Sequence, residues 1–309
     1  MNGHPRGHGT VVVGVDGSDR GFAGVRYAAQ EAQRLGVGLD VVHVSPGYLP
    51  EGPLLLIPDG SLQGFAAGVL ERGALIADET APDIDVATHH LSGHRIQELV
   101  GFAEDAALLV LGARNLSMMD HVWTGATVAG AVSRATCPTV VIPASWEPYV
   151  PRDRVVVGYK SQRHATELLT AAFALADGLG AELEVLHAWK LQGLYDDMIA
   201  SSAEEQETNA REVALIEPLL GDLRRAYPKV KAYARVVHRR AAGALIGASA
   251  RADRLIIIKP SHGARMHHLG GTARALLRDG QCPVEVIPPS HEAEDIPGLV
   301  IERGGELVP

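Results

Sequence analysis

The stretch VVVGVDGS at residues 11–18 returns as VVVGYKSQ at residues 155–162. Two further blocks return in the same order: LGVGLDVVHV at 35–44 as LGAELEVLHA at 179–188, and ATCPTVVIP at 135–143 as GQCPVEVIP at 280–288. The spacing between matching blocks is about 145 residues each time, which indicates a duplicated domain.

The length of 309 residues agrees with two domains, because a unit of about 145 residues is close to the commonest domain size. We expect five segments: a flexible N-terminus at 1–9, a first domain at 10–144, a linker at 145–153, a second domain at 154–288 and an acidic tail at 289–309.

The composition is that of a globular protein, with 46% hydrophobic and 21% charged residues. A net charge of −9 argues against general affinity for nucleic acid or anionic membranes, which need basic surfaces. No apolar run approaches the roughly 18 residues of a membrane span, and we expect the first residues not to act as a signal peptide. Two cysteines do not make a disulfide framework, so we expect buried thiols and a cytoplasmic protein.

Short apolar runs alternate with helical patterns in both repeats. The residues TVVVGV at 10–15 are typical of a strand buried on both faces. In the first repeat we expect strands at 10–15, 39–44, 84–91, 107–112 and 139–143, and helices at 22–36, 62–80, 95–104 and 126–135. In the second we expect strands at 154–159, 183–188, 230–237, 254–258 and 284–287, and helices at 163–179, 203–226, 240–251 and 272–279. This alternation predicts an α/β fold with two doubly wound, Rossmann-like parallel sheets of five strands, each in the order 3-2-1-4-5.

In that order the winding reverses between strands one and four, and a ligand crevice is expected at their carboxyl ends. Asp16 follows strand one, where its carboxylate can accept hydrogen bonds from an amino group or a hydroxyl; its alternative role is an Asx turn that ends the strand. Gly112 ends strand four, and Gly125 begins a helix whose backbone N–H groups can seat a phosphate, with the Thr127 hydroxyl beside them. Together these segments predict a nucleotide pocket.

At these residues the chain resembles the universal stress protein family in its tandem, two-domain form. The resemblance rests on VVVGVDGS, VVHV and LLVLGARN…TGATVAGAVSRATCPTVVIP, and it covers residues 10–288. It implies binding of ATP or another adenine nucleotide, alone or with Mg²⁺, in the first domain. It also implies that Asp16 contacts the adenine and that the main chain of Val44, in the second strand, does the same.

The family's ATP-binding members carry Gly-x2-Gly-x9-Gly-Ser/Thr after strand four, and this chain departs from that motif. Gly112 and Gly125 are present, but Asn115 replaces the second glycine and Ala126 replaces the hydroxyl residue. We therefore expect weakened triphosphate binding or a preference for a smaller nucleotide. The complete set of expected binding residues is Val15, Asp16, Val44, Gly112, Arg114, Asn115, Gly125, Ala126 and Thr127.

The second repeat departs further from the motif, with Lys160 in place of Asp16 and the sequence Lys-Pro-Ser-His at 259–262 in place of the glycine turn. We expect this repeat to be structural, its pocket closed or changed. The alternative is an anion site made by Lys259, His262 and Arg265.

The resemblance implies a regulatory stress-response role, a regulatory protein partner, and pairing of the two fifth strands so that the chain forms an internal pseudo-dimer, alone or within a homodimer. Two alternatives stay open: a nucleotide-free scaffold, and a slow ATP hydrolase or nucleotide-dependent transferase. The sequence contains no phosphate-loop, Gly-x-Gly-x-x-Gly or Gly-x-Ser-x-Gly motif, so we expect no enzyme and assign no catalytic residue. We also expect His43 and His187 to be satisfied core residues, and the other histidines to be exposed and not to bind metal.

Overall fold

The computed structural model of the chain describes residues 9–47, 61–112, 125–143, 145–147, 151–190, 202–259 and 269–289. The expected site residues Arg114 and Asn115 lie outside these ranges, as does almost all of the expected C-terminal tail. Residues 125–127 belong to a helix, but their side chains are outside the description.

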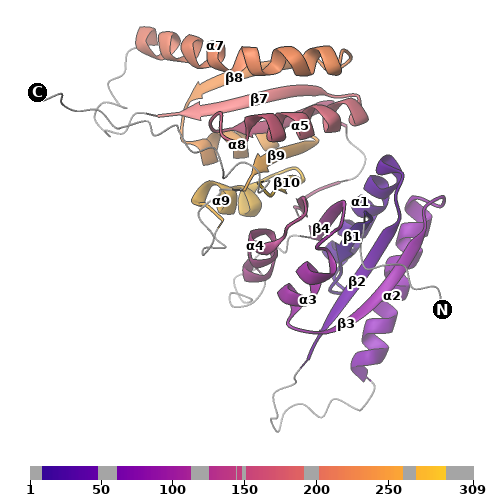
Figure 1. The fold of residues 1–309 in the computed structure, drawn as a ribbon. Helices are drawn as coiled ribbons and strands as arrows, with labels where there is room; N and C mark the ends of the chain where they lie inside the picture. The colour runs from indigo at the N-terminus through magenta and orange to yellow at the C-terminus, as the bar shows by residue number, and fades with distance from the viewer. Residues whose placement is uncertain are drawn as a thin grey trace, which may run out of the picture.

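The first repeat alternates strands and helices as the sequence predicts (Figure 1). Its elements are β1 (Val11–Gly14), α1 (Asp19–Leu35), β2 (Leu39–Pro46), α2 (Ser61–Thr80), β3 (Val86–Gly93), α3 (Arg95–Phe102), β4 (Leu108–Gly112), α4 (Gly125–Arg134) and β5 (Thr139–Ile142).

The second repeat follows the same order of elements. These are β6 (Arg154–Tyr159), α5 (Ala165–Leu179), β7 (Glu182–Trp189), α7 (Ser202–Ala226), β8 (Ala232–His238), α8 (Ala241–Ser249), β9 (Arg254–Ile258), α9 (Gly271–Asp279) and β10 (Val284–Ile287).

The sheet order is β3-β2-β1-β4-β5-β10-β9-β6-β7-β8, so each repeat has the expected order 3-2-1-4-5. Strands within a repeat pair in parallel, and the two expected five-stranded sheets join edge to edge into one ten-stranded sheet. The join is the pairing of the two fifth strands that the resemblance implied. It is antiparallel, with Val284 opposite Val141, Glu285 opposite Val140 and Val286 opposite Thr139.

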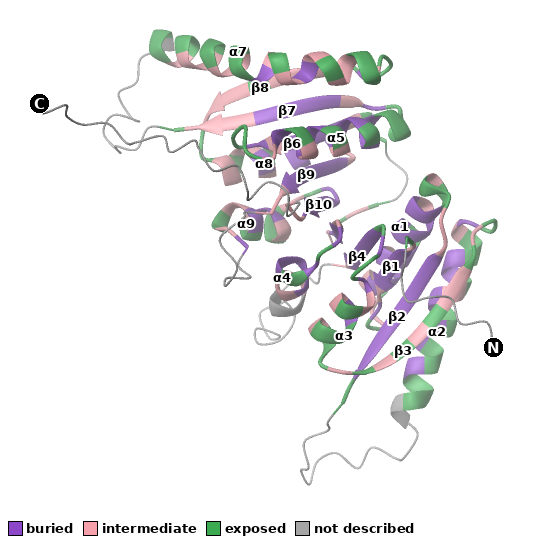
Figure 2. Cartoon of the chain, viewed as in Figure 1, coloured by how far each residue is buried: buried purple, intermediate pink, exposed green. Residues whose placement is uncertain are grey.

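Helices cover both faces of the sheet, and the inner strands are mostly buried, whereas the edge strands β3 and β8 are partly exposed (Figure 2). On one face a single apolar core runs through both repeats and packs α3, α4, α8 and α9 on the strands. The other face carries two separate cores, one beneath α1 and α2 and one beneath α5 and α7. The repeats are therefore joined by continuous apolar packing on one face only.

Helix α1 shows how local sequence places the first strand tip. The Ser18 side chain accepts a hydrogen bond from the Gly21 backbone N–H at 3.2 Å and caps the helix, as the sequence predicts. The helix ends at Gly36, which adopts the left-handed conformation (φ 67°) that a residue with a side chain rarely takes. The cap at Ser18 and the glycine at position 36 set where α1 begins and ends, so the helix starts just after β1.

Candidate functional site

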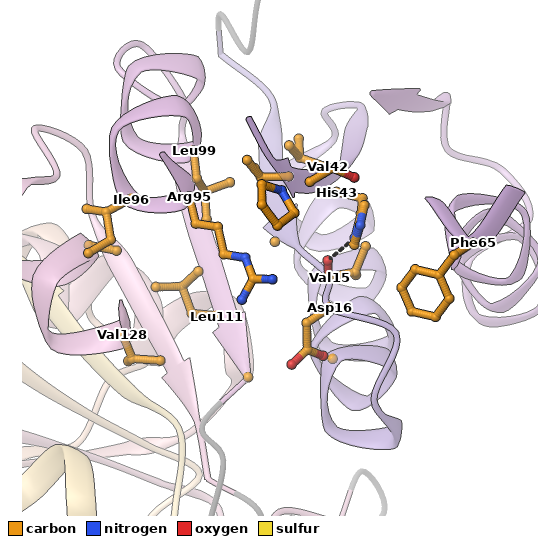
Figure 3. A pocket seen from close by; sticks show the side chains of 17 residues that line it. Val15, Asp16, Val42, His43, Phe65, Arg95, Ile96, Leu99, Leu111 and Val128 are labelled. Carbon is orange, nitrogen blue, oxygen red and sulfur yellow. Dashed lines mark hydrogen bonds between the residues drawn. The ribbon is translucent and has the colours of Figure 1, made fainter. Parts of the chain in front are cut away.

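A cavity of about 270 Å³ opens at the carboxyl ends of β1, β2 and β4, where the winding of the first repeat reverses. Helices α2, α3 and α4 complete its wall (Figure 3). The lining residues are mostly apolar, with the polar side chains of Asp16, His43, Ser45 and Arg95 among them. This is the crevice that the predicted topology located, and it is where ligands bind in sheets of this kind.

Four of the expected binding residues line this cavity: Val15, Asp16, Val44 and Gly112. Gly125 is the first residue of α4, as expected, and α4 also contributes Val128 to the wall. Arg114 and Asn115 fall outside the described residues, and the side chains of Ala126 and Thr127 do too. The structure thus brings together the expected residues of β1, β2 and β4, which lie far apart in the sequence.

Asp16 has a structural role as well as a place in the cavity. Its Oδ1 atom accepts hydrogen bonds from the Ser18 backbone N–H at 3.0 Å and from the Ser18 hydroxyl. This is the Asx turn that the sequence offered as an alternative role. The carboxylate is nevertheless exposed at the cavity, and an ionised carboxylate has four lone-pair sites, so the turn does not exhaust its capacity to accept hydrogen bonds.

Gly112 is required where the end of β4 meets the start of α1. A Cβ atom on Gly112 would lie 2.6 Å from the carbonyl oxygen of Arg20, which is too close for any side chain. The glycine therefore lets α1 approach the strand tip, independently of any ligand. Its position in the expected nucleotide motif coincides with a requirement of the fold.

His43 is a buried histidine that also faces the cavity. Its Nδ1 atom lies 2.9 Å from the carbonyl oxygen of Val15, and since a carbonyl only accepts, Nδ1 carries the proton. Burial lowers the pKa of His43, and the nearby His90 and Arg95 lower it further, although the bond to Val15 and the charge of Asp16 act in the opposite direction. The ring is therefore neutral near pH 7, and Nε2 is its acceptor atom. The expectation of a satisfied core histidine is confirmed for His43 and also for His187, which bonds the Tyr159 carbonyl at 3.1 Å.

The cavity-wall residues that sequence reasoning missed include Arg95 and Phe65. Arg95 is the first residue of α3, and its side chain extends between Leu111 and the Val15–Asp16 segment (Figure 3). Phe65 of α2 lies on the other side of the Val15–Asp16 segment, with 55% of its surface exposed and its ring 5.9 Å from that of His43. Both residues stand on helices away from the strand tips, so the rule that places ligands at strand ends did not select them.

At the corresponding end of the second repeat, larger side chains replace those of the first. Val15 corresponds to Tyr159 and Ser45 to Trp189, given the 144-residue offset between the matched His43 and His187. The Tyr159 ring is buried and packs edge-on against His187, and burial raises the pKa of its hydroxyl, with a further contribution from Glu212. Trp189 stacks on His238 at 4.2 Å and donates a hydrogen bond to Asn209 of α7 at 2.7 Å. Aromatic rings therefore occupy the ends of β6, β7 and β8.

Other histidines were expected to be exposed, and this is wrong for His89, His164 and His238. His90 is exposed, but His89 is half-buried and its Nε2 atom lies 2.7 Å from Oδ1 of the buried Asp40. The alternation of a strand explains the difference, because neighbouring residues point to opposite faces. His267 and His268 lie outside the described residues, and within the described ranges no cluster of three or more histidine, cysteine or acidic residues could hold a metal.

The anion site considered for the second repeat is only partly described. Lys259 is half-buried, its Nζ donates to the Ala135 carbonyl at 3.4 Å, and burial lowers its pKa. His262 and Arg265 are outside the description. In the part of the chain that the structure describes, no helix is both long and apolar enough to cross a bilayer.

The sheet order and the cavity define a doubly wound α/β protein made of two repeats. A model of the universal stress protein family matches residues 8–143 and again residues 151–288. The chain therefore belongs to the universal stress protein family and carries two copies of its domain.

Known relatives have the same tandem length. The chain is 30% identical over 302 residues to universal stress protein Rv2005c of Mycobacterium tuberculosis, covering 91% of this chain and 98% of that protein. It is 28% identical over 299 residues to universal stress protein Rv1996 of the same species, covering 89% and 94%. The crystal structure of a universal stress protein from Archaeoglobus fulgidus shares the fold, with a TM-score of 0.66 at 16% identity over 91% of this chain and 98% of that one.

Proposed function

We propose that the first repeat binds an adenine nucleotide and that occupancy of this site controls a regulatory stress-response function of the protein. The observation that carries the proposal is the cavity of about 270 Å³ at the reversal point of the first sheet. Its walls combine an apolar slot for a flat base with charged groups of both signs, Asp16 and Arg95. Pockets for small organic ligands have this composition.

Three features support a nucleotide over another small ligand. The Asp16 carboxylate stands where it can accept from an amino group or a ribose hydroxyl. The backbone of Val44 borders the cavity, in the place that the family resemblance assigns to an adenine contact. The start of α4 at Gly125 offers backbone N–H groups to a phosphate.

The second repeat has a different role in this proposal. Tyr159 and Trp189 stand where the first repeat has Val15 and Ser45, and Lys160 replaces Asp16. We assign this repeat to structural support of the first and to presentation of a surface to a protein partner. Two buried free cysteines are compatible with a reducing compartment, so we place the protein in the cytoplasm.

Calorimetric titration of the full chain with ATP, ADP, AMP and cyclic AMP, with and without Mg²⁺, tests the proposal. Saturable binding of at least one nucleotide is expected, weakened by Asp16→Ala and unchanged by Lys160→Ala. The matched variant Asp16→Asn keeps an oxygen acceptor for the turn to Ser18 but removes the charge. An affinity loss in Asp16→Asn without a loss of thermal stability assigns the carboxylate to the ligand and not to the turn.

The absence of binding at millimolar nucleotide would favour the nucleotide-free scaffold. Turnover of ATP well above background would favour the hydrolase or transferase. Equal effects of the Asp16 and Lys160 variants would refute the assignment to the first repeat.

A further inference from the structure

Arg95 is the first residue of α3, and this is an unfavourable place for a cation. A helix carries the equivalent of a partial positive charge at its N-terminus, which stabilises acidic side chains there and destabilises basic ones. The residue before it, His94, makes no capping hydrogen bond with its side chain. Helix formation therefore gives no reason for an arginine at this position.

The second repeat provides an internal comparison. Helix α8 is the counterpart of α3, and its first residue is Ala241. The two helices pack alike, since Leu99 of α3 approaches Gly14 of β1 as Leu245 of α8 approaches Gly158 of β6. The fold therefore accepts alanine at this position, and the arginine is particular to the repeat with the open cavity.

Packing and pairing do not explain Arg95 either. Among the described residues it makes no hydrogen bond or salt bridge, and its side chain is exposed. The guanidinium extends into the cavity near Leu111, at the end of β4 (Figure 3). A cation at this point lies within reach of a ligand in the cavity.

The two charged groups of the cavity come from different sides. The Asp16 carboxylate follows β1 and repels an anion, whereas Arg95 comes from α3 and extends between that segment and Leu111 of β4. A guanidinium presents a rigid fork of donors that matches the oxygens of phosphate. The cavity thus has one side suited to hydroxyl or amino groups and another suited to a phosphate.

We propose that Arg95 binds the phosphate group of the ligand and makes the site selective for a nucleotide over its nucleoside. The inference rests on the proposed adenine-nucleotide site and adds the residue that recognises the anion. Arg95 supplies in this chain a positive charge that the second repeat lacks at the matching position, Ala241.

Calorimetric titration of the full chain with adenosine and with AMP tests this role. In the wild type, AMP is expected to bind more tightly than adenosine. Arg95→Ala, which installs the residue found in the second repeat, is expected to lower AMP affinity about tenfold and leave adenosine affinity unchanged. Arg95→Lys is expected to recover part of the loss, because it keeps the charge but not the fork.

Arg26→Ala is the matched control. Arg26 is exposed on α1 outside the cavity, and its removal changes the net charge by the same amount. It is expected to leave both affinities unchanged, and the thermal midpoint of Arg95→Ala is expected not to fall.

The possible results separate the two claims. If the wild type binds adenosine and AMP but Arg95→Ala weakens neither, or weakens both equally, the phosphate role is overturned and the nucleotide site stands. If the wild type binds no adenine ligand, both the site and the role of Arg95 are refuted.

Discussion

Arg254 of β9 and Glu31 of α1 form a buried salt bridge of 2.5 Å between the two repeats. Their side chains are only 3% and 6% exposed. Arg254 also contacts Glu285 of β10 at 3.1 Å, and Glu31 contacts Arg34 at 2.8 Å. Burial by itself raises the pKa of Glu31, but Arg254 and Arg34 outweigh it, so the pKa is lowered and the carboxylate stays ionised.

This cluster lies on one side of the junction only. Counted back from the helix ends at Gly36 and Gly180, Leu175 of α5 corresponds to Glu31 of α1. In the strand ladders, Leu108 of β4 corresponds to Arg254 of β9, and Val140 of β5 corresponds to Glu285 of β10. Leu175, Leu108 and Val140 are all buried and apolar. The approximate symmetry of the repeats is therefore broken by charge at the face where their apolar cores are separate.

Replacing Arg254 with methionine is expected to destabilise the chain by roughly 3 to 5 kcal/mol, because two buried carboxylates lose their shared cation. The triple variant Glu31→Leu, Arg254→Leu, Glu285→Val copies the opposite side and is expected to recover most of that stability. Urea unfolding measures both. A triple variant no more stable than Arg254→Met would contradict this expectation, because it would show that apolar side chains cannot replace the buried ion pairs.

The stability of the first repeat is expected to depend on the protonation of His43. Since burial lowers its pKa in the folded state, the unfolded chain binds the proton more readily, and the contribution of His43 is complete above pH of about 6.5. It is lost as the pH falls from there through the lowered pKa. The unfolding free energy of the wild type, compared with that of His43→Gln between pH 8 and 5, reports this contribution. A constant difference across that range would contradict it.

Gly112 and Gly68 form a matched pair for backbone substitution. Gly112→Ala is expected to destabilise by about 1–3 kcal/mol, because the new methyl group would meet the Arg20 carbonyl at 2.6 Å. Gly68 lies inside α2 with nothing within 4 Å of an added Cβ, so Gly68→Ala is expected to stabilise by about 0.5–1 kcal/mol. Thermal unfolding distinguishes the two, and equal shifts would refute the close approach at Gly112.

The two cysteines are expected to be unreactive in the folded protein. Burial raises the pKa of Cys137 to about 11 and that of Cys282 to about 12. The thiolate is the reactive form, so labelling with a thiol reagent at pH 8 should be negligible in the native state and reach both thiols in urea. Rapid labelling of the native protein would mean that the segments around the two cysteines, just before β5 and β10, open readily.

Much of this architecture could be predicted from the sequence because its signals are local. The apolar strands and the cap at Ser18 are set by neighbouring residues, and the sequence repeat indicates that the same domain fold occurs twice. The same topology placed Asp16 and Gly112 in one crevice, since parallel strands bring their ends together, and Val44 was added by the family resemblance. The pairing of the fifth strands was implied only by the family resemblance.

Contacts between distant segments could not be read in this way. Glu31 follows an ordinary helix pattern, and nothing near it in the sequence indicates Arg254 as its partner. Arg95 looks like a surface residue at the start of a helix until α3 is packed against β2 and α4 at the cavity.

By itself, the sequence determined the duplicated α/β fold and the end of the sheet at which a ligand would bind, because periodicity and turn chemistry act over a few residues. Only the tertiary structure decided which charges meet: the Arg254–Glu31 pair between the repeats and Arg95 in the cavity. Electrostatic contacts depend on distances and burial in space, and these exist only once the strands and helices have packed.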